Sequence, residues 1–134
     1  MSDIPNDRLY TAEHEWAQAD SNDPLLMTIG ITDYAQTALG DIVMVEFPEV
    51  GDAVASNESL GALESPKSVS DVFAPFDGEI AAINEELEDA PETVNDDPYG
   101  SGWLVKIRVS DPGALADLMD AGAYKALLAG LEDG

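Results

Sequence analysis

Short apolar runs separated by turn-forming residues dominate the chain, and this pattern predicts a mainly β protein. Runs of alternating or β-branched apolar residues predict strands over residues 15–19, 25–31, 41–47, 53–54, 60–64, 69–73, 78–84 and 103–109. Clusters of Asp, Asn, Ser, Gly and Pro, such as those at 20–24 and 48–52, mark the turns. Many short strands with regularly spaced turns indicate a small β barrel or sandwich.

Helical patterns are confined to one short segment in the N-terminal half and to the end of the chain. Thr32 is a suitable N-cap for a short helix that Gly40 would end. From Asp111 onward, apolar residues recur at spacings of three and four, which predicts helices over about 111–131. The stretch 85–98 is acidic and contains two prolines, so it is expected to form an irregular surface loop.

The balance of charge excludes some classes of partner. The 134 residues include 28 Asp and Glu but only five Lys and Arg, which gives a formal net charge of −23. Such a surface repels phosphate backbones and anionic lipid head groups, so neither nucleic acid nor a membrane is an expected partner. Because acidic residues occur in every segment, the composition favours a salt-rich cytoplasm, where screening removes the self-repulsion. An acidic protein of an ordinary cytoplasm is the alternative.

The sequence gives little support to independent catalysis. His14 is the single histidine and there is no cysteine, so no thiol nucleophile is available and no metal site is expected. Neither a nucleophile elbow nor a glycine-rich phosphate loop is present. Pairs of carboxylates are too frequent to single out one acid–base couple. We therefore interpret His14 as a structural side chain and the chain as non-catalytic. A polar, acidic start without an apolar run favours a cytoplasmic location.

One lysine stands apart from the other basic residues. Lys67 is the only basic residue between Asp41 and Ser101, and apolar runs flank it on both sides. Pro66 and the neighbouring serines favour a tight turn, which would place Lys67 at the tip of a hairpin. A projecting amine is what a modifying enzyme needs to enclose. On these residues alone, an incidental lysine in a turn is an equal alternative.

The residues around Lys67 resemble a known motif. The pattern Glu64-Ser-x-Lys67-x-x-Ser70-Asp71, followed by Ala74-Pro75-x-x-Gly78-Glu79, is similar to the lipoylation hairpin of glycine cleavage system H proteins. Further blocks resemble the same family in the same order: His14-Glu15-Trp16, Gly30-Ile31-Thr32-x-Tyr34-Ala35-Gln36, 39–43, 47–51, Val94-Asn95-x-x-Pro98-Tyr99 and Gly102-Trp103. Pro66 and Ser68 depart from the pattern, since the family more often has an aliphatic and a small residue there.

This resemblance implies a fold and a set of site residues. The implied fold is a small barrel-sandwich hybrid of the lipoyl- and biotinyl-carrier type, forming one lipoyl-carrier domain over residues 1–134 with its lipoylation hairpin at about 60–80. It implies a lipoate cofactor in amide linkage to Lys67. Glu64 and Asp71 are the implied recognition residues for lipoylation, and Glu15 and Tyr34 are candidates for a groove that shelters the lipoyl arm.

The function that the resemblance implies is that of a carrier. Family members shuttle the aminomethyl group of glycine from a pyridoxal phosphate-dependent glycine decarboxylase to a tetrahydrofolate-dependent aminomethyltransferase. They also pass electrons to dihydrolipoamide dehydrogenase. A lipoate ligase or lipoyltransferase attaches the cofactor. All four enzymes are therefore expected partners.

Other functions stay open at this stage. A lipoate-relay protein, or a lipoyl domain serving a 2-oxoacid dehydrogenase, would carry the same cofactor. Biotin carriers have Met on both sides of the modified lysine, which Pro66 and Ser68 do not supply. An unmodified binding module with an incidental lysine is the alternative from a different class.

Overall fold

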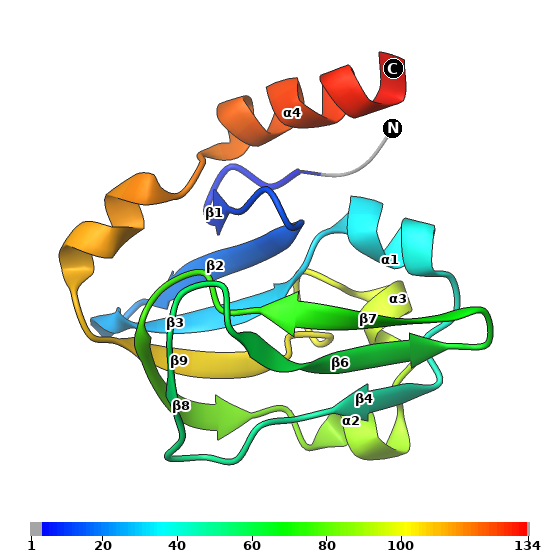
Figure 1. Cartoon of the computed structure of the whole chain (residues 1–134), viewed down its shortest axis with the longest axis horizontal. Helices are drawn as coiled ribbons and strands as arrows, with labels where there is room; N and C mark the ends of the chain where they lie inside the picture. The colour runs from blue at the N-terminus through cyan, green and yellow to red at the C-terminus, as the bar shows by residue number, and fades with distance from the viewer. Residues whose placement is uncertain (1–3, 134) are drawn as a thin grey trace.

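Two antiparallel sheets pack against each other in the computed structural model, which describes residues 4–133 (Figure 1). The described strands are β1 (Leu9–Tyr10), β2 (Glu15–Asp20), β3 (Asp23–Ile31), β4 (Met44–Glu46), β5 (Ala53–Val54), β6 (Ser59–Ser65), β7 (Ser68–Phe73), β8 (Gly78–Ile83) and β9 (Val105–Val109). The helices are α1 (Asp33–Leu39), α2 (Glu86–Asp89), α3 (Thr93–Asp96), a 3-10 helix η1 (Pro112–Asp117) and α4 (Ala121–Asp133).

The larger sheet has six strands in the order β1-β2-β3-β9-β8-β5, and the smaller has three in the order β4-β6-β7. Every strand pairing is antiparallel, and the two sheets do not close into a single barrel. A short helix follows β3, and helices end the chain. The predicted mainly β barrel-sandwich fold is therefore confirmed.

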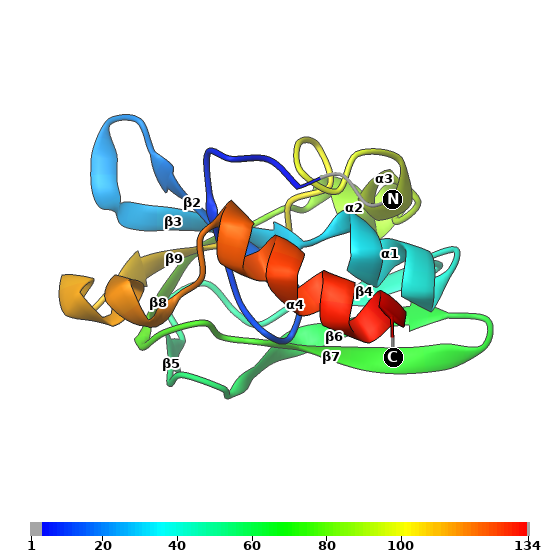
Figure 2. The ribbon, with the colours of Figure 1, turned by 90° about the horizontal axis from the view of Figure 1, so that it is seen from above.

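The space between the sheets holds the main core because the inward side chains of both sheets are apolar. Met27, Ile29 and Ile107 come from the larger sheet, and Leu63 and Val72 from the smaller. A second apolar cluster lies where α4 covers the first two strands, and its buried members are Tyr10, Trp16, Ala121, Tyr124 and Leu128. Figures 1 and 2 show α4 lying across β1, on the side of the molecule where α1 also lies.

The structure corrects two details of the predicted elements. The stretch 85–98 is not an irregular loop but contains α2 and α3, because Leu87 and Val94 are fully buried and anchor each short helix to the core. The strand predicted over 41–47 is reduced to β4. The Ile42 amide donates to Asn95 Oδ1 at 2.8 Å instead of to a strand, whereas the Val43 amide already donates to the Glu64 carbonyl oxygen of β6 at 2.8 Å.

The acidic side chains form few ion pairs with basic side chains in the described part of the chain. Arg8 pairs with Asp7 and Arg108 with Asp23, each at 2.8 Å, and Glu15 is the one buried acid there. Most carboxylates therefore repel one another without compensation.

We expect far-UV ellipticity to be lost when the purified protein is moved to dilute buffer and to return in molar salt, because the Debye length falls to about 3 Å at 1 M. Circular dichroism across a salt series measures this. Complete folding in dilute buffer would contradict the proposed adaptation to salt.

Candidate functional site: a hairpin lysine and the adjoining groove

Lys67 lies at the tip of the β6–β7 hairpin. Ser65 pairs with Ser68, so Pro66 and Lys67 alone form the turn, and both are exposed. The Ser65 hydroxyl donates to the Ser68 carbonyl oxygen at 3.3 Å. Figures 1 and 2 show this tip at the same end of the molecule as the last turn of α1. The sequence-based placement of Lys67 at a hairpin tip is confirmed.

The Lys67 side chain lies over the residue that ends α1. Gly40 has a φ of 83°, a left-handed conformation that glycine adopts without strain. A Cβ atom placed on Gly40 would lie 3.3 Å from Lys67 Cε and 3.8 Å from its Nζ. Glycine therefore serves two purposes here, since it allows the helix to end and leaves room for the lysine.

Asn95 on α3 holds the end of α1 in place. Its Nδ2 donates to the Gly40 carbonyl oxygen at 2.8 Å and to Gln36 Oε1 at 3.0 Å. Its Oδ1 accepts from the Ile42 amide. Asn95 belongs to one of the sequence blocks that resemble the family, but the sequence alone does not indicate a role for it. A role of this kind depends on contacts across more than 50 residues of chain, as with the 55 that separate Asn95 from Gly40.

We expect Asn95→Ala to lower the free energy of unfolding by about 2 kcal/mol, because it leaves three partly buried polar groups without their partner. Chemical denaturation measures this loss. The exposed neighbour Asp96 provides the matched control, and Asp96→Ala is expected to change stability by less than about 0.5 kcal/mol. Equal effects of the two substitutions would contradict this role of Asn95.

A groove with a volume of about 140 Å³ runs between α1 and the hairpin. One wall is formed by α1, with Tyr34 and Leu39 among its residues, and the facing wall includes Asp71 on β7. Leu39 immediately precedes Gly40, so this end of the groove is one residue away from the glycine over which the Lys67 side chain lies. At its other boundary are Glu13, His14 and Glu15.

Glu15 brings a buried carboxyl group to this groove. The residue is 3% exposed, and its carboxylate oxygens accept from Thr11 Oγ1 at 2.7 Å and from the Phe73 amide at 3.2 Å. Burial raises the pKa of Glu15 to about 7, and the two hydrogen bonds oppose that shift only in part. A cation entering the groove would favour the ionised carboxylate. The site is therefore suited to hold a positively charged group.

The structure separates the predicted site residues into two groups. Glu15, Tyr34 and Asp71 all line the groove. Glu64 does not line it: this residue pairs with Met44 on one side and Val69 on the other, and it alternates with the buried Leu63, so its side chain lies on the outer face of the small sheet. Among the predicted site residues, Glu64 and Lys67 therefore lie outside the groove.

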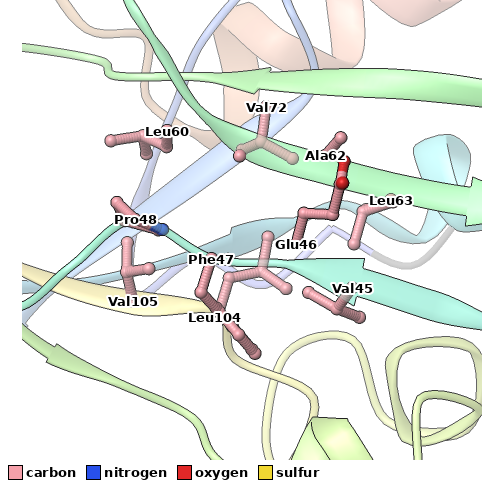
Figure 3. Close-up of a pocket in the computed structure, with 11 residues that line it drawn as sticks. Val45, Glu46, Phe47, Pro48, Leu60, Ala62, Leu63, Val72, Leu104 and Val105 are labelled. Atoms are coloured by element: carbon pink, nitrogen blue, oxygen red, sulfur yellow. The ribbon is translucent and has the colours of Figure 1, made fainter.

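Two other hollows differ in kind from the groove. One, with a volume of about 10 Å³, is bounded mostly by apolar side chains such as Phe47, Leu60 and Leu104, and Figure 3 shows these converging between strands. It has room for about one water molecule and is part of the core. The other, about 330 Å³, adjoins Glu15 from the side of Thr11 and Met119. Residues 4–133 contain no cluster of His, Asp and Glu arranged to hold a metal ion.

Fold and site together define a barrel-sandwich protein of the carrier type, in which a hairpin presents one lysine beside a groove.

A family model described as glycine cleavage H-protein matches residues 8–130. The chain is 53% identical to the glycine cleavage system H protein of Chromohalobacter salexigens over 99% of this chain and 100% of that one. The corresponding protein of an Anaeromyxobacter species is 52% identical over 94% and 96% of the two chains. The crystal structure of a glycine cleavage system H protein from Mycobacterium marinum superposes with a TM-score of 0.82 at 42% identity, covering 92% of this chain and 97% of the other. The chain belongs to the glycine cleavage H-protein family.

Proposed function

We propose that this chain, as one lipoyl-carrier domain over residues 1–134, carries a lipoyl group on Lys67 and serves the glycine cleavage system. The observation that carries the proposal is the position of Lys67, which is exposed at a hairpin tip while its side chain lies over Gly40, next to Leu39 of the groove. A surface lysine without a function is not expected to combine these two features. Family membership supports the cofactor and the multienzyme system.

The residues of the groove fit the cofactor and its cargo. A lipoyl group in amide linkage to Lys67 would supply a pair of sulfur atoms that cycle between disulfide and dithiol, which this cysteine-free chain lacks, for carrying the aminomethyl group and for electron transfer. Glu15 offers a buried carboxylate to a cationic amine, and Tyr34 and Leu39 offer apolar contact to a hydrocarbon arm. The protein thereby binds, orients and shelters, and its own residues perform no bond chemistry.

The proposed partners are the decarboxylase, the aminomethyltransferase, dihydrolipoamide dehydrogenase and the enzyme that attaches lipoate. The outer face of the small sheet suits all four because it adjoins Lys67. Met44 and Val69 are 52% and 63% exposed there and flank Glu64 from either side. Apolar contact surrounded by carboxylates fits an enzyme surface with a basic rim. None of the helices in residues 4–133 is long and apolar enough to cross a membrane, and we propose a cytoplasmic location.

We expect Met44→Ser and Val69→Ser each to raise the KM for this carrier about five-fold with the aminomethyltransferase while kcat stays unchanged, because they remove apolar contact area without touching Lys67. Initial-rate kinetics with the lipoylated protein as substrate measure this. Val50 is 59% exposed, lies outside the small sheet and provides the control. A KM that rises equally in Val50→Ser would contradict docking at this face.

The decisive experiment is intact and peptide mass spectrometry of the protein isolated from its own host, followed by reconstitution with the purified enzymes. The expected result is a lipoyl mass increment on Lys67 and lipoate-dependent cleavage of glycine. A bare lysine in a cell that lipoylates other proteins would overturn the proposal, and a biotin increment would place the protein with the carboxylases. Transfer of the lipoyl group to a 2-oxoacid dehydrogenase in the same mixture would identify a relay function instead of, or beside, glycine cleavage.

A further inference from the structure

A single hydroxyl group on the C-terminal helix contacts both sides of the groove. Tyr124 on α4 is fully buried, and its hydroxyl oxygen lies 2.8 Å from His14 Nδ1 and 2.8 Å from Thr32 Oγ1. His14 lines the groove next to Glu15. Thr32 caps α1, the helix that forms one groove wall, by accepting the Ala35 amide at 3.3 Å. The two groove elements therefore meet at Tyr124.

The segment that Tyr124 holds is not in a relaxed conformation. His14 has a φ of 69°, a left-handed conformation that is unfavourable for a residue with a side chain, so the surrounding contacts must stabilise it. The Thr32 amide donates to the His14 carbonyl oxygen at 3.0 Å, which ties the same two residues a second time through the backbone. His14 also contacts the ring of Tyr34 with centroids 4.6 Å apart. A shift of His14 would thus be passed directly to α1.

The chemistry of a phenol couples the two contacts. A tyrosine hydroxyl has one proton, so it satisfies His14 and Thr32 together by donating to one and accepting from the other. Burial raises the pKa of Tyr124, so the hydroxyl keeps that proton. Its ring stacks on Tyr10 with centroids 4.8 Å apart and planes inclined by 3°, which fixes where the hydroxyl can point.

We propose that Tyr124 is a positioning residue of the groove: its hydroxyl sets the distance between the segment bearing His14 and Glu15 and the N-terminus of α1. The consequence for the lipoyl arm rests on the proposed function, whereas the bridge itself does not. The C-terminal helix then does more than cover apolar surface. Together with the backbone bond between Thr32 and His14, it holds the two sides of the groove in place beside Glu15.

The test compares Tyr124→Phe with Tyr10→Phe. Both variants keep the stacked rings and remove one hydroxyl, but the hydroxyl of Tyr10 donates to the Pro5 carbonyl oxygen rather than to a groove residue. Thr32→Ser keeps a hydroxyl at the other end of the bridge.

The first two readouts use the unmodified protein: the ring nitrogen shifts of its single histidine, and amide exchange at Ala35 and Gln36, whose N–H groups bond to Thr32. The third is the rate at which the lipoylated protein loses its aminomethyl cargo to water.

In Tyr124→Phe we expect a changed nitrogen shift of His14 and about five-fold faster exchange and cargo loss, the effect of removing one hydrogen-bonding group. Tyr10→Phe and Thr32→Ser should match the wild type. Wild-type exchange in Tyr124→Phe, or equal acceleration in Tyr10→Phe, would overturn the proposal. If Lys67 carries no lipoyl group, the function proposed above fails, yet the nitrogen shift and the exchange rates still decide the role of Tyr124.

Discussion

Lys67→Ala is expected to eliminate both lipoyl attachment and every activity of the protein in reconstituted glycine cleavage, while leaving its stability within about 0.5 kcal/mol of the wild type. The physical reason is that the amine is the only proposed point of attachment, and the lysine is exposed at a two-residue turn with little packing to lose. Intact mass after treatment with a lipoate-attaching enzyme, glycine decarboxylation assays and chemical denaturation measure the three quantities.

Two further substitutions give this experiment its controls. Lys67→Arg keeps the positive charge but cannot form the amide, so it is expected to be as inactive as alanine. Lys125 on α4 is also exposed, and Lys125→Ala should leave modification and activity unchanged. Residual lipoylation of Lys67→Ala would show that another lysine is the acceptor and would refute the assignment.

The second large effect concerns the dependence of stability on pH. Burial raises the pKa of Glu15 from 4.5 to about 7, so the folded state holds this proton more tightly than the unfolded state. Between about pH 4.5 and pH 7 the unfolded chain releases the proton first, and the free energy of unfolding therefore falls as the pH rises. The whole loss from Glu15 amounts to about 3 kcal/mol above pH 7.

Glu15→Gln removes this titration. We expect the stability of Glu15→Gln relative to the wild type to increase by about 3 kcal/mol between about pH 4 and pH 8, whatever the constant cost of the altered hydrogen bonds. Denaturant titrations at both pH values in molar salt provide the comparison. Glu58→Gln is the control because Glu58 is an exposed acid that does not line the groove. A constant difference between Glu15→Gln and the wild type would show that Glu15 does not titrate in this range.

Local patterns predicted those parts of the fold that depend on local interactions. Thr32 was expected as an N-cap and Gly40 as the helix end, and both residues have these roles because capping needs only the adjacent turn. The strands flanking Lys67 were placed to within about one residue by their apolar alternation. The acidic stretch 85–98 was misjudged because one buried side chain in each short helix, Leu87 or Val94, outweighs an unfavourable composition.

The sequence predicts the hairpin tip that carries Lys67, but not the contacts that hold the walls of the groove in place. A lone lysine between apolar runs is visible in the sequence, and the family resemblance added Glu15, Tyr34 and Asp71, which the structure brings together. Asn95 and Tyr124 act through contacts that join residues 55 and 110 positions apart. No periodicity or spacing reports such pairs, because they arise only when the two sheets and α4 pack.

Because Ser65 pairs with Ser68, the number of residues in β6 and β7 determines that Lys67 lies at the tip of the hairpin. A change of residue type at Pro66 leaves β6 and β7 in step and Lys67 still at the tip. One added or deleted residue in either strand would shift the register and turn every following side chain to the other face of the sheet, because successive side chains of a strand point to opposite faces. Val72 would then leave the core and its exposed neighbour Asp71 would enter it. The exposed turn position at Pro66 therefore tolerates a change of residue type, whereas the length of the hairpin is fixed by the inward side chains Leu63 and Val72.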